Sequence, residues 1–350
     1  MKYPPCQLLS VFTLGVLISG CRTEVNVFEK YHKSVVLLYH EYYYKVTVND
    51  RSWYLGYDKA SNTYQWNSDI TQLNVKPYSA FGTGFFIDRQ GRIATNKHVV
   101  DDWFNSYEPT YRKLFQSWME ENKNKAASNR DNANRQIILW TNIYNTTYDY
   151  YMADSARREI NAWKMNLETY SADETMWTTL LSFLPQAKFD VHSLLLGYAL
   201  DGSTISSTND FQRCHLIRSS ANDNIDLAII QANNTNTPVP ANSIVNINDI
   251  NERQEIKVGE EVSMIGFNLG PQLAISKNGL QVQKTDGKIS QQSDGDKVLY
   301  SISALHGSSG SPVFDKAGNL VAINYAGLDF TQNFNYGVLA KHLKLLLRSN

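Results

Sequence analysis

The sequence predicts a mainly β fold that is interrupted by a helical insertion and closed by a C-terminal helix. Short apolar runs bounded by turn residues occur before residue 101 and again after residue 190, as is typical of an all-β core. Between them, aromatic residues recur at helical spacing, which indicates the insertion. Leu339–Arg348 has the pattern of the closing helix, and 350 residues suffice for two hydrophobic cores.

The first expected strands lie in a tyrosine-rich region near the start of the folded body. Ser34–Leu38 is apolar and predicts the first strand of the core. Val46–Val48 and Trp53–Leu55 flank the polar Asn49–Ser52, which has the composition of a turn. We therefore expect an extra hairpin here.

A histidine and an aspartate each stand where an apolar strand meets polar residues. Gly82–Asp88 and Arg92–Asn96 predict two strands joined by a turn, and His98 follows immediately. Asp226 opens Asp226–Ile230, an apolar run of strand length that would hold the carboxylate at the edge of a core. Asp223 is the alternative carboxylate, but its polar neighbours favour a solvated turn.

A serine lies in the glycine-rich loop Gly307-Ser308-Ser309-Gly310-Ser311-Pro312. A serine hydroxyl becomes a nucleophile when an imidazole takes its proton and a carboxylate orients that imidazole. His98, Asp226 and Ser309 occur in this order and are candidates for the three roles. Glycine at 307 allows a sharp turn that could aim the backbone amides of Gly307 and Ser309 at one oxyanion. The alternative interpretation is an ordinary glycine–serine hairpin turn.

Four motifs in the same order resemble those of trypsin-fold serine peptidases, most closely the bacterial Deg/HtrA-type branch. The motifs are Gly82–Ile87, Thr95–Val100, Asp226–Ile230 and Gly307–Pro312. The resemblance implies an all-β core of two antiparallel six-stranded β-barrels with the active cleft between them. It also implies a serine endopeptidase that cleaves proteins or peptides through an acyl-enzyme, with His98 as general base, Asp226 as its orienter and Ser309 as nucleophile. It implies no cofactor and leaves no room for an appended PDZ module.

The resemblance carries further expectations about the substrate pocket. By family position, Ser303 approaches the base of the primary pocket, while Asn324 and Tyr325 form a wall. Ser303 is not acidic, so a preference for lysine or arginine is not supported. Ser308 stands where zymogen-activated relatives carry an aspartate, so activation by insertion of a new N-terminus is not expected.

The N-terminus resembles a bacterial lipoprotein signal. Lys2 is followed by the apolar Leu8–Ile18, which is too short to span a membrane as a mature helix, and then by Ser19-Gly20-Cys21. The resemblance implies that Cys21 becomes the lipidated first residue and tethers the body in the bacterial cell envelope, with the outer membrane or periplasmic side favoured. An ordinary secretory signal is the alternative. Cys214 remains as the only thiol of the folded body, and we interpret it as a small buried residue.

The insertion after His98 predicts two to four helices. Apolar residues fall on one face in three successive groups, and we interpret them mainly as a helix-packing core. The groups are Tyr111, Leu114, Phe115, Trp118 and Met119, then Tyr144, Tyr148, Tyr151 and Met152, then Ile160, Trp163, Leu167 and Tyr170. Because the insertion leaves the core directly after the candidate base, we expect it to overhang the cleft, to limit access or select substrates, and to offer a surface to a regulatory partner.

Composition excludes other classes of function. The 33 basic and 34 acidic residues nearly cancel, so no basic field for nucleic acid is present. The histidines are scattered without the spacing of a metal site. A different class of function stays open, namely a lipid-anchored binding protein on the same scaffold that is catalytically silent or is activated by a partner. The oligomeric state is not indicated.

The predicted domain boundaries follow from these patterns. They are 1–20 for the signal, 21–101 and 191–232 for the two parts of the first barrel, 102–190 for the helical insertion, 233–243 for the linker, and 244–350 for the second barrel with the closing helix.

Overall fold

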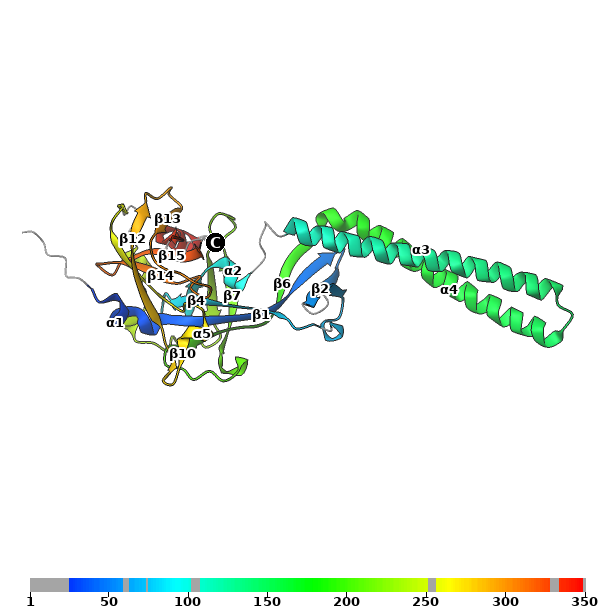
Figure 1. Ribbon diagram of the computed structural model, residues 1–350, viewed down its shortest axis with the longest axis horizontal. Coiled ribbons are helices and arrows are strands. Elements are labelled where there is room, and N and C mark those ends of the chain that lie inside the picture. Colours follow the sequence, from blue (N-terminus) through cyan, green and yellow to red (C-terminus); the bar gives the residue numbers. More distant parts are fainter. Residues whose placement is uncertain are drawn as a thin grey trace, which may run out of the picture.

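The computed structural model describes residues 25–58, 63–73, 75–101, 108–250, 256–327 and 334–348. They form two β-barrels side by side and a long helical hairpin that extends from the first barrel (Figure 1). The predicted signal and Cys21 lie outside the described residues. None of the described helices is both long enough and apolar enough to cross a membrane.

Six antiparallel strands close the first barrel in the order β1, β4, β5, β8, β7, β6 and back to β1. The strands are β1 (Val35–Val48), β4 (Tyr78–Phe86), β5 (Arg92–Thr95), β6 (Lys188–Leu200), β7 (Gln212–Ser219) and β8 (Ala228–Ala232). Side chains along β1 alternate between two cores, as a pleated strand requires. Val35 and Leu37 belong to a core shared with the second barrel, whereas Val36 and Leu38 belong to a core confined to the first.

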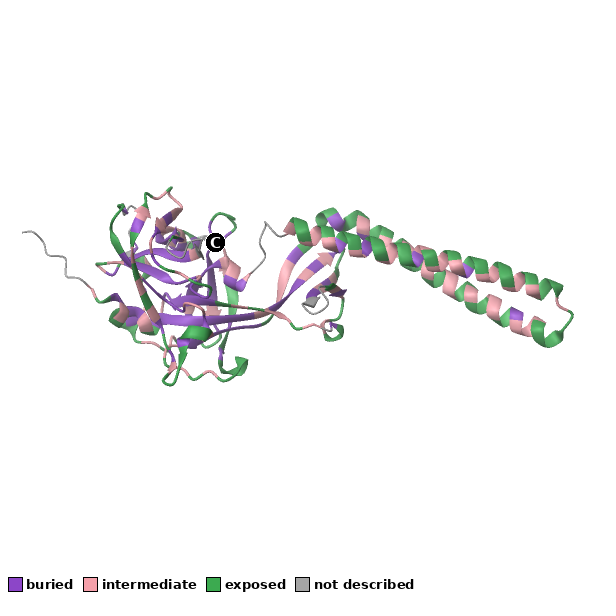
Figure 2. Ribbon diagram, in the orientation of Figure 1, coloured by how far each residue is buried: buried purple, intermediate pink, exposed green. Residues whose placement is uncertain are grey.

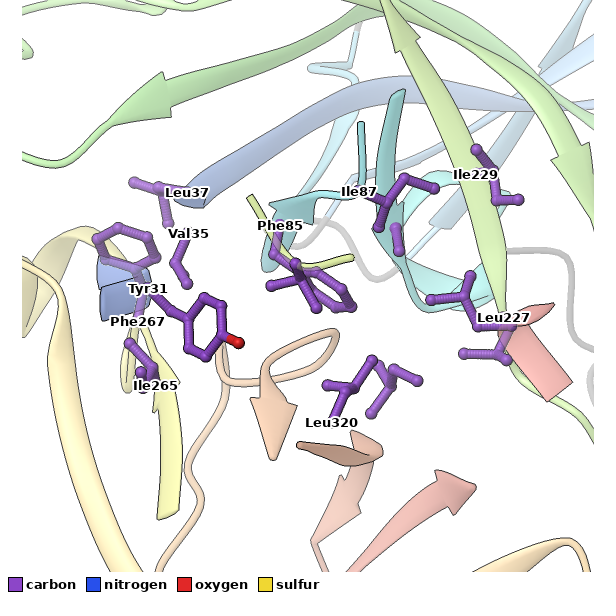
Figure 3. Packing of buried hydrophobic residues seen from close by; sticks show 14 of the residues in the cluster. Tyr31, Val35, Leu37, Phe85, Ile87, Leu227, Ile229, Ile265, Phe267 and Leu320 are labelled. Carbon is purple, nitrogen blue, oxygen red and sulfur yellow. The ribbon is translucent and has the colours of Figure 1, made fainter. Parts of the chain in front are cut away.

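Six further antiparallel strands close the second barrel in the order β12, β13, β16, β15, β14, β9. The strands are β9 (Glu261–Gly266), β12 (Gln283–Gln291), β13 (Lys297–Tyr300), β14 (Pro312–Asp315), β15 (Leu320–Gly327) and β16 (Asn335–Leu339). Phe267 and Leu320 meet Phe85 and Leu227 of the first barrel in the shared core (Figure 3). The prediction of two six-stranded barrels is therefore confirmed.

Shorter elements complete the two barrels. They are α1 (Val27–Tyr31), α2 (Lys97–Val100), α5 (Pro271–Ala274), β10 (Ile275–Ser276), β11 (Gly279–Leu280) and α6 (Ala340–Arg348). α6 is the predicted closing helix, and it buries Leu343 and Leu346 in the shared core. The predicted linker 233–243 falls within the crossing between the end of β8 and the start of β9.

A small sheet continues the first barrel outward. β1 and β6 run on past a bulge at Glu41/Tyr42, and β2 (Arg51–Asp58) and β3 (Thr63–Asn67) pair beside β1. Val48 pairs with Arg51, so the loop between them holds only Asn49 and Asp50, both with positive φ. Such a two-residue turn matches the twist of a hairpin. The predicted extra hairpin is confirmed, with a turn shorter than expected.

The insertion is a single antiparallel helical hairpin, here called the arm, made of α3 (Glu108–Thr146) and α4 (Tyr150–Phe183). With 39 residues α3 is about 58 Å long. The helices α3 and α4 point away from both barrels (Figure 1), so the expectation that the insertion overhangs the cleft is wrong. The reason is that the arm stands on the outward continuation of β1, β2 and β6, not on the rim of the barrel.

The three predicted apolar groups of the insertion differ in burial, and the third, which is Ile160, Trp163, Leu167 and Tyr170, is partly buried. At the base of the arm, Phe115 and Met119 are fully buried in a cluster that includes Trp53, Trp66 and Leu180, so the interpretation as a packing core is confirmed there. At the far end, the second predicted group is exposed, and the interpretation is wrong for it; these residues are Tyr144, Tyr148, Tyr151 and Met152. Figure 2 shows the contrast between the buried barrels and the largely exposed arm.

Candidate active site

The structure brings His98 and Asp226 into direct contact. His98 lies on α2, which the buried Val99 and Val100 anchor to the first barrel. One oxygen of the Asp226 carboxylate lies 2.5 Å from Nδ1 of the His98 ring, and the other accepts a 3.0 Å hydrogen bond from the backbone N–H of His98. An ionised carboxylate only accepts hydrogen bonds, so Nδ1 carries the ring proton and Nε2 is the basic nitrogen.

The alternative carboxylate does not take part in this contact. The Asp223 side chain is 63% exposed, and its nearest cation is the Lys97 ammonium at 4.0 Å. The segment that carries Asp226 is instead fixed by Asn96, a buried residue whose Nδ2 donates to the backbone carbonyl of Asp226 at 2.7 Å. Asn96 was predicted only as a strand end and as part of the Thr95–Val100 motif; a polar amide two residues before His98 was the available signal.

The loop around Ser309 depends on two glycines. Gly307 has φ +96° and Gly310 has φ +89°, a region that side chains with a Cβ rarely adopt. A Cβ at Gly307 would lie 2.5 Å from the backbone nitrogen of Gly270, and one at Gly310 would lie 2.0 Å from the carbonyl oxygen of Thr83. Within the described part of the chain, the amides of Gly307 and Ser309 donate no hydrogen bond. They are therefore available to an oxyanion.

Thr83 joins this loop to the first barrel. It is fully buried on β4, its N–H donates to the carbonyl of Ser309 at 2.7 Å, and its hydroxyl donates to the carbonyl of Gly307 at 2.8 Å. The same hydroxyl accepts from the amide of Phe267 at 3.1 Å. One side chain thus holds the loop and a strand end of the second barrel together. This role of Thr83 was not predicted, although Thr83 is a hydroxyl residue inside an apolar strand.

Ser309 itself is half-buried and its hydroxyl makes no hydrogen bond to His98 among the described residues. The two residues are linked through the backbone, because Thr83 bonds to Ser309 and accepts a 2.8 Å bond from the hydroxyl of Thr95, three residues before His98. Catalytic hydrogen bonds are often long or unmade without substrate and tighten when it binds. The structure therefore brings His98 and Asp226 into contact, and it holds the loop of Ser309 by hydrogen bonds to Thr83 on β4, the strand that pairs with β5.

The predicted pocket residues lie in different environments. Ser303 is exposed, Tyr325 is half-buried, and Asn324 is 1% exposed. Oδ1 of Asn324 accepts from the hydroxyl of Tyr300 at 2.8 Å, and its Nδ2 donates to the carbonyl of Ser308 at 3.2 Å. Burial raises the pKa of Tyr300 well above its usual value, so this hydroxyl stays protonated. Asn324 braces the serine loop from inside the barrel; a contact with the substrate stays a prediction for all three pocket residues.

Two other titratable side chains of the first barrel, Cys214 and His40, are buried. Burial raises the pKa of the Cys214 thiol to about 12, which confirms the interpretation of Cys214 as an inert buried residue. Burial lowers the pKa of His40 to about 4, so its ring is neutral near pH 7. In the part of the chain that the structure describes, no group of three or more histidine, cysteine or acidic side chains is placed to hold a metal.

One family of known proteins is similar to part of the chain. The profile of a family described as a trypsin-like peptidase domain matches residues 201–323, which include Asp226 and Ser309. His98 lies before this match, separated from Asp226 by the arm. No protein among the curated sequences is significantly similar to this chain.

Two solved structures are similar to the chain. The serine endoprotease from Yersinia pestis is 14% identical with a TM-score of 0.44, and the match covers 92% of this chain and 64% of that one. An inactive mutant form of Rv3671c from M. tuberculosis H37Rv is 11% identical with a TM-score of 0.41, and the match covers 92% of this chain and 88% of that one. The chain thus spans less than two thirds of the Yersinia protein.

Proposed function

We propose that this chain, whose residues 201–323 match a trypsin-like peptidase domain, is a serine endopeptidase whose triad is His98, Asp226 and Ser309. The observation that carries the proposal is the double contact of the Asp226 carboxylate with His98, to Nδ1 at 2.5 Å and to the backbone N–H at 3.0 Å. A carboxylate held in this way selects the ring tautomer that a general base needs.

In the proposed reaction, Nε2 of His98 takes the proton from the Ser309 hydroxyl as its oxygen attacks a peptide carbonyl. The amides of Gly307 and Ser309 stabilise the negative oxygen of the tetrahedral intermediate. His98 then protonates the leaving amine, and a water molecule activated by the same ring hydrolyses the acyl-enzyme. Asp226 stays ionised throughout and stabilises the imidazolium. The substrates are proteins or peptides, with those of the cell envelope proposed from the N-terminal motif.

A second candidate function follows from the Ser309 hydroxyl, which has no hydrogen bond to His98 among the described residues. In this alternative, the protein is silent on its own and works as a binding protein, or it becomes active when a partner or substrate orders the serine loop. The two forms differ in whether any condition makes Ser309 nucleophilic.

A fluorophosphonate probe tests the proposal, because only an activated serine attacks its phosphorus, displaces fluoride and becomes phosphonylated. We expect labelling at Ser309, located by peptide mass spectrometry, and loss of labelling in His98→Ala. Labelling that requires an added peptide would support the partner-activated form. Absence of labelling at every pH and with every added peptide would exclude the enzyme. Digestion of a proteome-derived peptide library, under the conditions in which the probe labels Ser309, then reports the preferred side chain at the cleavage site.

We also propose that the chain is anchored in the bacterial envelope by a lipid on Cys21. Only residues 22–24 separate Cys21 from Val25, whose backbone N–H donates to the carbonyl of Lys316 at 3.0 Å. Four residue steps span at most about 14 Å, so the lipid would hold the second barrel close to the membrane surface. Several buried acyl chains would make this attachment stable.

Metabolic labelling with palmitate tests the anchor. We expect the label in the membrane fraction of the parent protein, because acylation of Cys21 supplies the hydrocarbon, and no label in Cys21→Ser. Cys6→Ser is the matched control and should keep both the label and the membrane location. Label that persists in Cys21→Ser would show that the attachment lies elsewhere.

A further inference from the structure

Large exposed apolar side chains concentrate at the far end of the arm. This end, residues 136–152, is here called the arm tip; it comprises the end of α3, the turn and the first residues of α4. Tyr148 is fully exposed, Tyr150 and Tyr151 are about four-fifths exposed, and Ile138 is 62% exposed. The tip also exposes Leu139, Tyr144 and Met152. Isolated exposed apolar residues are ordinary, but a cluster on a projecting element indicates an interaction site.

The arm tip is almost free of charge. No charged residue occurs from Gln136 to Tyr148, and the one carboxylate in the turn, Asp149, caps α4 by accepting from the amide of Met152 at 2.9 Å. Arginines border the tip on both helices, at Arg135 on α3 and at Arg157 on α4. Asp154 neutralises much of the second border, since it pairs with Arg157 at 2.7 Å. The tip thus combines apolar and aromatic side chains with small polar ones, inside a charged boundary.

The apolar side chains surround the tip and do not form one stripe. Ile138 and Leu139 are consecutive on α3, and Tyr150, Tyr151 and Met152 are consecutive on α4. Neighbouring residues of a helix point about 100° apart, so these side chains face several directions. A folded partner that docks on one side of a helix needs a stripe at helical spacing, whereas a lipid environment contacts all sides.

We propose that the arm tip inserts into the interfacial layer of a lipid bilayer. Tyrosine is enriched at this layer because its ring is apolar and its hydroxyl remains hydrated. Residues 136–146 of α3 extend about 16 Å, which suffices for the depth of about 5–10 Å that interfacial segments reach. Arg135, which is exposed and forms no ion pair among the described residues, lies at the border where lipid phosphates would be. The barrels do not obstruct the tip, because the arm carries it to the end of the molecule opposite α1 (Figure 1). The proposed Cys21 anchor lies at the α1 end, so the bilayer that the tip enters is a different membrane surface from the one that would hold the second barrel.

Vesicle binding tests the proposal with a protein that begins at Arg22, which keeps every described residue and removes the apolar Leu8–Ile18. Vesicles of phosphatidylethanolamine and phosphatidylglycerol serve as the probe. We expect the protein to float with them, and we expect the triple variant Tyr148→Ser, Tyr150→Ser, Tyr151→Ser to lose about tenfold in partitioning, because interfacial binding scales with buried apolar area. The matched control is Met165→Ser, an exposed apolar residue on α4 outside the tip, which should bind as the parent does.

A site-specific fluorophore separates insertion at the tip from binding elsewhere. This protein lacks Cys6 and Cys21, and the buried Cys214 is inert, so Tyr148→Cys supplies a unique reactive thiol. An environment-sensitive maleimide dye at residue 148 should shift to the blue when vesicles are added. The same dye at Thr169→Cys, exposed part-way along α4, should not shift. Circular dichroism of each variant checks that the arm stays helical.

Three outcomes would overturn the proposal. The first is that the parent protein does not bind these vesicles, and the second is that the triple tyrosine variant binds them as tightly as the parent does. The third is a concentration-dependent self-association in sedimentation velocity, without vesicles, that the triple variant abolishes; the tip would then be an interface between copies of this chain. None of these readouts depends on peptide cleavage.

Discussion

Replacing Ser309 by alanine is expected to abolish peptide hydrolysis and fluorophosphonate labelling while leaving the fold and substrate affinity intact. The proposed nucleophile is the hydroxyl, which takes no part in the hydrogen bond that the carbonyl of Ser309 accepts from the amide of Thr83. Loss of a serine nucleophile typically lowers kcat by about 10⁶-fold. Single-turnover kinetics on a peptide found in the library digest, with thermal unfolding as a check on folding, measures the effect.

Ser311→Ala is the matched control for this change. Ser311 lies two residues along the same loop, and its buried hydroxyl has no hydrogen-bond partner among the described residues. Removing an unsatisfied buried hydroxyl is near neutral for stability, so activity should persist. Peptide cleavage by Ser309→Ala at a rate comparable with the parent would overturn the assignment of the nucleophile.

Replacing Asp226 by asparagine is expected to produce the second largest loss. The amide nitrogen of asparagine donates a hydrogen bond, so the ring of His98 would be held with Nδ1 as acceptor and Nε2 protonated, unable to take the proton of Ser309. Substitutions of this kind lower kcat by about 10⁴-fold at neutral pH. Because substrate binding does not use this carboxylate, KM should change little, and steady-state kinetics would show the separation.

Asp223→Asn provides the comparison for Asp226→Asn. Asp223 is three residues away and exposed, and its weak pairing with Lys97 at 4.0 Å contributes little. We expect the rate of Asp223→Asn to match the parent. A larger loss in Asp223→Asn than in Asp226→Asn would show that Asp223, and not Asp226, is the orienting carboxylate.

The contact of His98 with Asp226 could be predicted from the sequence because each residue adjoins a strand that burial fixes. Ile93 and Ile229 are both buried, and β5 pairs directly with β8, so the residues that follow or precede these strands meet at one edge. Apolar runs of strand length place each residue at a strand end, and the resemblance to trypsin-fold peptidases implied that the two ends meet.

The roles of Thr83 and Asn324 could not be predicted in this way. The hydroxyl of Thr83 bonds to a carbonyl 224 residues along the chain, and a strand pattern gives no sign of such a partner. Asn324 sits on β15, where only the register with the serine loop brings its amide to Ser308. Hydrogen bonds between distant segments depend on how the two barrels pack, which strand periodicity does not determine.

Helical spacing predicted the helices of the arm but not its direction. Phe115 and Tyr148 belong to similar apolar patterns, yet one is fully buried and the other fully exposed. The difference is what lies opposite each residue. Trp53 and Trp66, from the outward sheet, cover the base of the arm, whereas no described element covers its tip. A periodic pattern shows which side chains share a face, but not whether another surface meets that face.

The continuity of β1 has a mechanical consequence. This strand runs without a break from the base of the arm into the first barrel, where Leu37 pairs with Thr83. A load on the arm would therefore pass along this one strand, through the bulge at Glu41/Tyr42, into the first barrel. Thr83, which pairs with Leu37 near the barrel end of β1, is the residue whose amide and hydroxyl hold the backbone around Ser309.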